Sequence, residues 1–388
     1  MVSSSFRAEV AFFLLVLSLI LAGCGTTHVC NASGASCCGT GLCPVQPGPE
    51  MLYATTSLTN PNQILTMSID PKTGALGAAS STPGPANSIG VTAFNGQYLY
   101  ASDTPSAEVF GYAINQSTGA LSALAGSPFS TGPLSVPAGL GTAPGSSTAF
   151  LYAADAGGVD GFSVDVTTGL PTPIRGSPFA SGTNLWLAVD PFGKFLYSTD
   201  QNRPGGIFGF TIGSTGALSL VAGSPFTIPG QTVSNSQPVG VINTGTFVYA
   251  GLSATNQIAA FSIVSGTGAL IPVPGSPFAA GANPDLLVLG RGSFLYARNA
   301  TDGTISGYSI NPTSGVLTPI TGSPFQIPGG TMTADPYGRY LYVTSAGGIR
   351  AFSIDATSGT LSEMSGSPFP ASGAFYLTTV QVPPPSLQ

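Results

Sequence analysis

This sequence contains few charged residues. Charged residues make up 6% of its 388 residues, whereas a typical soluble protein has about 25%. The formal net charge is −6, and the nine Lys and Arg residues form no cluster along the chain. Because phosphate binding needs a basic surface, nucleic acid is excluded as an expected partner.

Histidine and cysteine are also scarce. Histidine occurs once, at His28, and no cysteine follows Cys43. The remaining chain therefore offers no His general base, no Ser-His-Asp triad, no His metal ligand and no Cys nucleophile. No P-loop motif is present either, so we expect neither a metal nor a cofactor. Long segments of helical periodicity are missing after the N-terminus, which predicts a chain nearly without helices.

The N-terminus has the pattern of an export signal. Residues 10–22 are apolar apart from Ser18, a run too short for the about 20 residues that span a bilayer. The run ends in Leu21-Ala22-Gly23-Cys24, which resembles the lipobox of bacterial lipoproteins; a signal peptide with a chance cysteine is the alternative. The resemblance implies cleavage after residue 23, a lipidated Cys24 and anchoring to the bacterial envelope. Gly25, in place of the Asp typical of inner-membrane retention, favours the outer membrane.

Residues 24–50 are expected to form a tether. This segment holds four further cysteines, Cys30, Cys37, Cys38 and Cys43. An even number in an exported segment suggests two disulfides, with three pairings open. A metal site that includes His28 is the alternative, although no Cys-x-x-Cys is present. Prolines after Cys43 favour an extended linker.

A repeat begins at residue 51. A Tyr in an apolar strand recurs every 45 to 52 residues, at Tyr53, Tyr100, Tyr152, Tyr197, Tyr249, Tyr296 and Tyr342. Each repeat also has a second strand, a turn that ends in Thr-Gly or Ser-Gly, and a short strand. Six repeats then continue into Gly-Ser-Pro-Phe. A period near 47 residues with several short strands predicts an all-β, seven-bladed propeller of four-stranded blades over residues 51–381.

The two ends of the repeat predict how the ring closes. The first repeat lacks the strand that precedes the Tyr strand in every other repeat. The missing copy is residues 374–380, which should supply the innermost strand of blade 1 and remove an open sheet edge. Residues 382–388 remain as a tail. The Phe of each Gly-Ser-Pro-Phe is expected to pack between blades.

Two segments connect these repeats to a known family. Asp190-Pro191-Phe192-Gly193-Lys194-Phe195-Leu196-Tyr197 and Leu341-Tyr342-Val343-Thr344-Ser345 resemble the YVTN-type repeats of the lactonase-like propeller family. That family includes a 6-phosphogluconolactonase. The resemblance covers about residues 51–381. It implies the seven-bladed fold and, as an activity to test, hydrolysis of a sugar lactone.

Repeat phase separates structural acids from candidate site residues. Five acids occupy repeated turn positions and are assigned to turns: Asp70, Asp165, Asp190, Asp335 and Asp355. Three others lie three residues past the strand Tyr, where the strand runs into a loop. These three and their loop neighbours are the ligand-binding candidates: Asp103, Asp155, Asp200, Arg203, Arg298, Asn299 and Asp302. They are either turn caps or a polar rim for a sugar-like ligand or a cation. Trp186, the single tryptophan, either packs in the core or offers a stacking platform at the channel mouth.

Two function classes follow from these residues. The first is a lipid-anchored module that binds or scaffolds a protein, a glycan or a small molecule, with no catalytic residue assigned. The second is a lactone hydrolase, which rests on the family resemblance. A phosphorylated lactone would meet only Arg203 and Arg298 in the candidate loops.

Overall fold

The computed structural model describes residues 48–56, 62–131, 138–144, 148–155, 157–179, 184–200, 206–231, 237–291 and 293–383. The predicted signal peptide, Cys24, the four tether cysteines and His28 lie outside these residues. The described residues form strands and turns, with no helix among them, as predicted. Consequently no helix in the described ranges could span a membrane.

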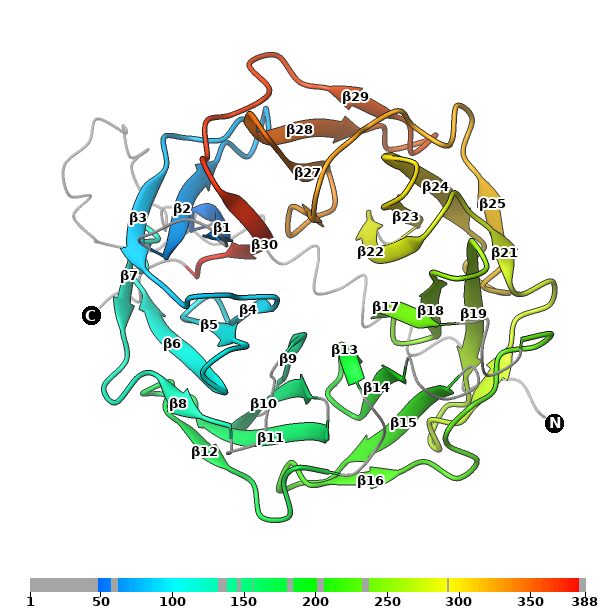
Figure 1. Ribbon diagram of the computed structural model, residues 1–388, viewed down its shortest axis with the longest axis horizontal. Coiled ribbons are helices and arrows are strands. Elements are labelled where there is room, and N and C mark those ends of the chain that lie inside the picture. The colour runs from blue at the N-terminus through cyan, green and yellow to red at the C-terminus, as the bar shows by residue number, and fades with distance from the viewer. Residues whose placement is uncertain are drawn as a thin grey trace, which may run out of the picture. The chain divides into compact units, whose positions relative to one another are not determined.

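Seven antiparallel sheets surround a common centre, and each corresponds to one sequence repeat (Figure 1). The inner strands of blades 1 to 7 are β30 (Ala374–Gln381), β4 (Val91–Phe94), β9 (Leu140–Ala143), β13 (Asn184–Val189), β17 (Pro238–Asn243), β22 (Pro284–Gly290) and β26 (Met332–Ala334). The second strands are β1 (Glu50–Thr56), β5 (Tyr98–Asp103), β10 (Thr148–Asp155), β14 (Phe195–Asp200), β18 (Phe247–Leu252), β23 (Phe294–Asn299) and β27 (Tyr340–Ser345).

The third strand of each blade is long and mostly buried, whereas the fourth is short and mostly exposed. The third strands are β2 (Gln63–Ile69), β6 (Glu108–Ile114), β11 (Gly158–Asp165), β15 (Gly206–Ile212), β19 (Gln257–Ile263), β24 (Thr304–Ile310) and β28 (Gly348–Ile354). The fourth strands are β3 (Ser80–Pro83), β7 (Leu121–Ala123), β12 (Pro171–Pro173), β16 (Leu218–Leu220), β20 (Leu270–Pro272), β25 (Leu317–Pro319) and β29 (Leu361–Glu363). Two short strands, β8 (Phe129–Ser130) and β21 (Phe278–Ala279), pair with β6 and β19.

The repeated tyrosines join neighbouring blades. All seven are fully buried in the second strands. Each hydroxyl donates a hydrogen bond of 2.6 to 2.9 Å to the carbonyl oxygen of the turn glycine in the next blade. These glycines have positive φ, and a Cβ at Gly169 (φ 72°) would lie 2.3 Å from the Tyr98 ring. The Tyr and Gly signals of the sequence thus form a single contact between blades.

The other repeated positions have the predicted structural roles. Asp70, Asp165 and Asp355 accept backbone hydrogen bonds within their own turns, and these bonds lower the pKa of each carboxyl. Asp190 and Asp335 accept hydrogen bonds within their hairpins. Phe179 packs on a core cluster shared by blades 3 and 4, and Phe278 packs on one shared by blades 5 and 6. The expected position of these phenylalanines between blades is confirmed.

The C-terminal strand closes the ring, as predicted. β30 pairs antiparallel with β1 from Glu50↔Gln381 to Thr56↔Ala374. The red β30 lies beside the blue β1 in Figure 1. Beyond the strand, the backbone N–H of Val382 donates to the carbonyl oxygen of Pro49 at 3.0 Å. The first and last described residues of the propeller therefore belong to the same blade.

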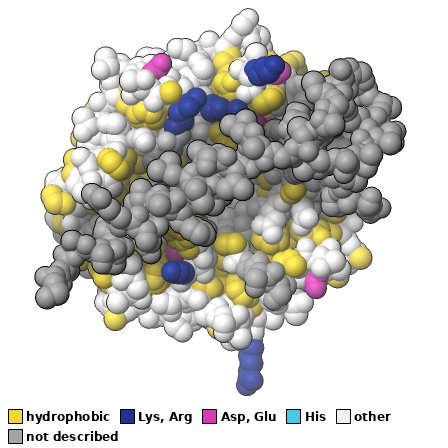
Figure 2. Space-filling model, turned by 180° about the vertical axis from the view of Figure 1, so that it is seen from behind, with side chains coloured by type: hydrophobic (Ala, Val, Ile, Leu, Met, Phe, Trp, Pro, Cys, Tyr) yellow, Lys and Arg dark blue, Asp and Glu magenta, His cyan; other side chains and the backbone are white. Residues whose placement is uncertain are grey.

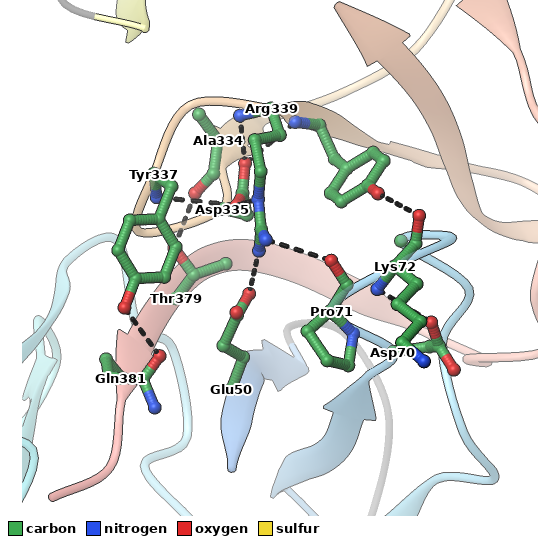
Figure 3. Close-up of polar contacts among 12 residues, drawn as sticks. Glu50, Asp70, Pro71, Lys72, Ala334, Asp335, Tyr337, Arg339, Thr379 and Gln381 are labelled. Atoms are coloured by element: carbon green, nitrogen blue, oxygen red, sulfur yellow. Dashed lines mark hydrogen bonds and ion pairs between the residues drawn. The ribbon is translucent and has the colours of Figure 1, made fainter. Parts of the chain in front are cut away.

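An ion pair joins blade 7 to blade 1 (Figure 3). Arg339 donates to Asp335 (2.8 Å) in its own hairpin and to Glu50 (2.5 Å) at the start of β1. Its third hydrogen bond reaches the carbonyl oxygen of Pro71 at 2.9 Å. Glu50 is 5% exposed, so the closing seam contains a buried carboxylate held by one guanidinium. Elsewhere charge is sparse: Figure 2 shows a few charged side chains scattered among uncharged ones on the face behind Figure 1.

Candidate functional site

The three strand-end aspartates are buried. Asp103, Asp155 and Asp200 are 4%, 3% and 0% exposed. Asp103 accepts hydrogen bonds from the backbone N–H of Asn87 (3.0 Å) and from the Ser106 hydroxyl (2.7 Å), because the loops on both sides fold over the strand end. For Asp103 this is the geometry of a turn cap.

Asn299 links β23 to β24, and Asp302 links the loop between these strands to the segment before β22. Asn299 is fully buried, and its side-chain amide donates to the hydroxyls of Thr304 (2.8 Å) and Ser306 (2.9 Å). Asp302 is exposed and accepts a hydrogen bond of 2.6 Å from the backbone N–H of Ala282. Arg203 lies outside the described residues. A ligand role for these three and for the strand-end aspartates stays a prediction.

Four inner strands carry a β-bulge at the same phase of the repeat. In each, one extra residue stands opposite the end of the second strand: between Asn184 and Leu187 in β13, Pro238 and Val241 in β17, Pro284 and Leu286 in β22, and Ala374 and Tyr376 in β30. A bulge kinks its strand and redirects a side chain, and bulges are common at barrel rims and beside active sites. Here they lie at the edge where the inner strands begin.

One equivalent position per blade surrounds the channel at this edge. The strand registers align Gly90, Gly139, Trp186, Gly240, Leu286, Thr331 and Tyr376, each two residues before the inner-strand residue that faces the repeated Tyr. Three of the seven positions are glycine, which leaves room beside the large side chains. Two adjoining cavities of about 130 and 90 Å³ lie here, and both are lined by Trp186, Leu286, Thr331 and Tyr376.

An ion pair borders the larger cavity. Asp285 is the extra residue of the β22 bulge, and Arg298 lies on the adjacent strand β23. Arg298 Nε donates to Asp285 Oδ1 at 2.7 Å, and Arg298 Nη2 donates to Asp285 Oδ2. The two side chains are 21% and 19% exposed, so the pair remains partly open to solvent. Such a two-pronged contact fixes the orientation of both groups.

Two aromatic side chains meet across the ring. Trp186 belongs to blade 4 and Tyr376 to blade 1, yet their ring centroids are 5.7 Å apart with planes tilted by 40°. Phe375 holds Tyr376 edge to face at 4.9 Å. Burial raises the pKa of Tyr376 to about 12, so its hydroxyl stays protonated and can both donate and accept. Trp186 packs against the core of blades 4 and 5, as one interpretation predicted, and also lines the cavities. Its use as a stacking platform stays a prediction.

Sequence reasoning identified two of the four side chains that converge at these cavities. Arg298 and Trp186 were singled out, whereas Asp285 and Tyr376 were not. Asp285 occupies none of the repeated turn positions that the five structural acids share, which was a usable signal. Tyr376 carried no signal beyond its strand pattern, because its neighbour across the channel is 190 residues away in the chain. No group of three or more His, Cys, Asp and Glu side chains suited to a metal ion occurs within the described ranges.

Part of the propeller matches a protein-family model. Residues 226–333 match the family "Lactonase, 7-bladed beta-propeller". The resemblance to the lactonase-like propellers is confirmed. The matched segment runs from blade 4 to blade 7 and contains Asp285, Arg298 and Thr331.

Solved lactonase-like propellers share the whole fold. A candidate 6-phosphogluconolactonase from Bacteroides uniformis matches with a TM-score of 0.70 and 18% identity, over 86% of this chain and 100% of its own. One from Bacteroides fragilis has a TM-score of 0.70 and 19% identity, over 87% and 99%. A periplasmic gluconolactonase from Pseudomonas aeruginosa has a TM-score of 0.65 and 18% identity, over 86% and 100%. At these identities the likeness establishes the fold alone. A search by sequence among curated proteins found no match.

Proposed function

We propose that this lactonase-like propeller is a binding module that takes a small polar ligand at the mouth of its channel. The observation that carries the proposal is the cavity itself, where an Arg298–Asp285 pair and two aromatic rings converge. Ligand sites are typically concave and mostly apolar, with a few placed polar groups. The glycines at three of the seven channel positions provide the space.

The ion pair supports binding over catalysis. A general base must reach a proton of its substrate or of a water molecule. Both oxygens of Asp285, the carboxylate that lines the larger cavity, already accept hydrogen bonds from Arg298. This arrangement suits the orientation of a ligand better than proton transfer. Hydrolysis of a sugar lactone is the alternative function, and the family match over residues 226–333 favours it because the segment includes five of the seven residues that line the larger cavity.

We predict that the purified protein does not hydrolyse glucono-1,5-lactone or 6-phosphogluconolactone at an enzymatic rate. General acid–base catalysis contributes about 10²–10⁴-fold, so a catalyst would exceed the spontaneous rate clearly. The rate is measured by pH-stat, with and without protein, for the parent and for Asp285→Asn. A large rate in the parent that Asp285→Asn abolishes would establish the hydrolase. The Asp103/Asp155/Asp200→Asn triple variant tests whether such a rate arises instead at the strand ends.

The anchor at Cys24 stays a proposal that rests on the lipobox. We expect cells that produce the full chain to attach a labelled fatty acid to it and to retain it in the membrane fraction. Cys24→Ser should abolish the label, because the thiol is the acceptor. The control is a substitution at one of the four downstream cysteines, Cys30→Ser, which should keep the label. An unlabelled parent, or a labelled Cys24→Ser variant, would refute the anchor.

A further inference from the structure

Two side chains of opposite charge line the cavity at the channel mouth, and their charges cancel. Arg298 and Asp285 carry opposite charges and are held together through two hydrogen bonds. An anion that approaches Arg298 also meets the carboxylate beside it, and at the pair's low exposure this repulsion is screened less than in water. The chain as a whole carries a net charge of −6, which adds to the disadvantage of an anion.

The pair nevertheless keeps unused hydrogen-bonding capacity. A guanidinium has five N–H donors and a carboxylate about four acceptor sites, and the mutual contact uses two of each. Donors and acceptors are thus left side by side at the edge of the pair. Neighbouring hydroxyl groups of a ligand can donate to one and accept from the other. The protonated hydroxyl of Tyr376 extends the same capacity across the cavity.

The aromatic pair provides the matching apolar surface. The ring faces of Trp186 and Tyr376 carry partial negative charge, and weakly positive C–H groups pack favourably on such faces. A saturated ring with axial C–H bonds and peripheral hydroxyls presents both features at once. The size of the site sets an upper limit. Cavities of about 130 and 90 Å³ are smaller than the about 300–1,000 Å³ of drug-sized sites, which favours a single ring over a chain of rings as the ligand.

Building on the proposed function, we infer that the channel mouth selects an uncharged polyhydroxylated six-membered ring, a neutral monosaccharide, against the anionic forms of the same sugar. Asp285 is the residue that sets this preference, because it cancels the charge of Arg298. Trp186 and Tyr376 hold the ring face.

The single tryptophan makes the test direct, because any change in tryptophan emission reports on Trp186. The protein is titrated with D-glucose, D-galactose and myo-inositol as neutral rings, and with D-glucose 6-phosphate and D-gluconate as anions. We expect saturable emission changes with at least one neutral ring. Binding of glucose 6-phosphate and gluconate should be at least tenfold weaker.

The matched variant is Asp285→Asn, which keeps the size of the side chain and removes its charge. We expect the preference to move by at least tenfold toward glucose 6-phosphate, since Arg298 is then unopposed. Trp186→Phe removes the emission signal, so sugar binding to this variant is measured by calorimetry. The comparison with the parent tests whether the bound ring contacts Trp186.

The outcomes separate the inference from the proposal beneath it. The selectivity would be overturned, and the binding function left intact, by either of two results. One is that the anions bind the parent with the same affinity as the neutral rings, and the other is that Asp285→Asn leaves the preference unchanged. Failure of every probe to bind, by emission and by calorimetry, would overturn both.

Discussion

Deletion of residues 374–388 is expected to prevent the propeller from closing and to leave the protein aggregated or with a strongly lowered melting temperature. β30 covers β1, whose residues are all buried. Its removal exposes the backbone groups of β1 as a free sheet edge, which invites association with other chains. It also removes Leu377 and Val382, which are buried in two clusters that blade 1 shares with its neighbours.

Two variants make this deletion interpretable. Residues 384–388 come after the closing strand in the sequence, so their removal alone should change the melting temperature little. Leu377→Ala keeps the strand and should destabilise by about 2–5 kcal/mol in denaturant unfolding, the usual range for a buried Leu. If the long deletion were as soluble and as stable as the parent, the assignment of β30 as the closing strand would be wrong.

Arg339→Met is expected to destabilise the protein by about 3–5 kcal/mol at pH 7, the range measured when one partner of a buried ion pair is removed. Arg339 reaches Glu50 and Asp335 from the same guanidinium, as Figure 3 shows. Asp335 also accepts backbone hydrogen bonds within its hairpin, for example from Tyr340 at 2.7 Å. The loss therefore falls mainly on Glu50, which would become a buried charge without its counter-ion.

The stability loss in Arg339→Met should depend on pH, and the pKa of Glu50 sets the direction of that dependence. Burial raises the pKa of Glu50, Arg339 opposes that rise, and Asp335 adds to it. A carboxyl with a raised folded-state pKa contributes stability below its unfolded pKa and loses that contribution as the pH rises through the folded pKa. Without Arg339 the pKa of Glu50 should rise further. The deficit of Arg339→Met should therefore shrink as the pH is lowered from 7 toward 4.5, the ordinary pKa of glutamate.

The matched control is Glu50→Gln, which removes the buried charge and keeps the shape. Its effect at pH 7 should be small, and the Glu50→Gln/Arg339→Met double variant should recover much of the stability lost in Arg339→Met. Urea unfolding at several pH values measures the free energy of unfolding of the parent, the two single variants and the double variant. A double variant no more stable than Arg339→Met alone would show that Glu50 is not the group that needs Arg339.

The fold was readable from the chain because its signals are local and repeated. The apolar strands, the turn glycines and the recurring Tyr all act within one repeat or on the next one. Seven copies at one phase left few alternatives. Even ring closure was predictable, since the first repeat lacks the strand that residues 374–380 supply. The resemblance of two repeats to lactonase-like propellers pointed to the same fold.

The site depended on tertiary structure instead. Asp285 reaches the cavity because a bulge displaces it, and Tyr376 meets Trp186 only because the closed ring brings blades 1 and 4 together across the channel. Neither a one-residue bulge nor a contact across the ring leaves a pattern in the neighbouring sequence. The same reason explains the burial of Asp103: the sequence alone determined that it stands at a strand end, while the folded loops that bring Asn87 and Ser106 to its carboxylate decided its exposure.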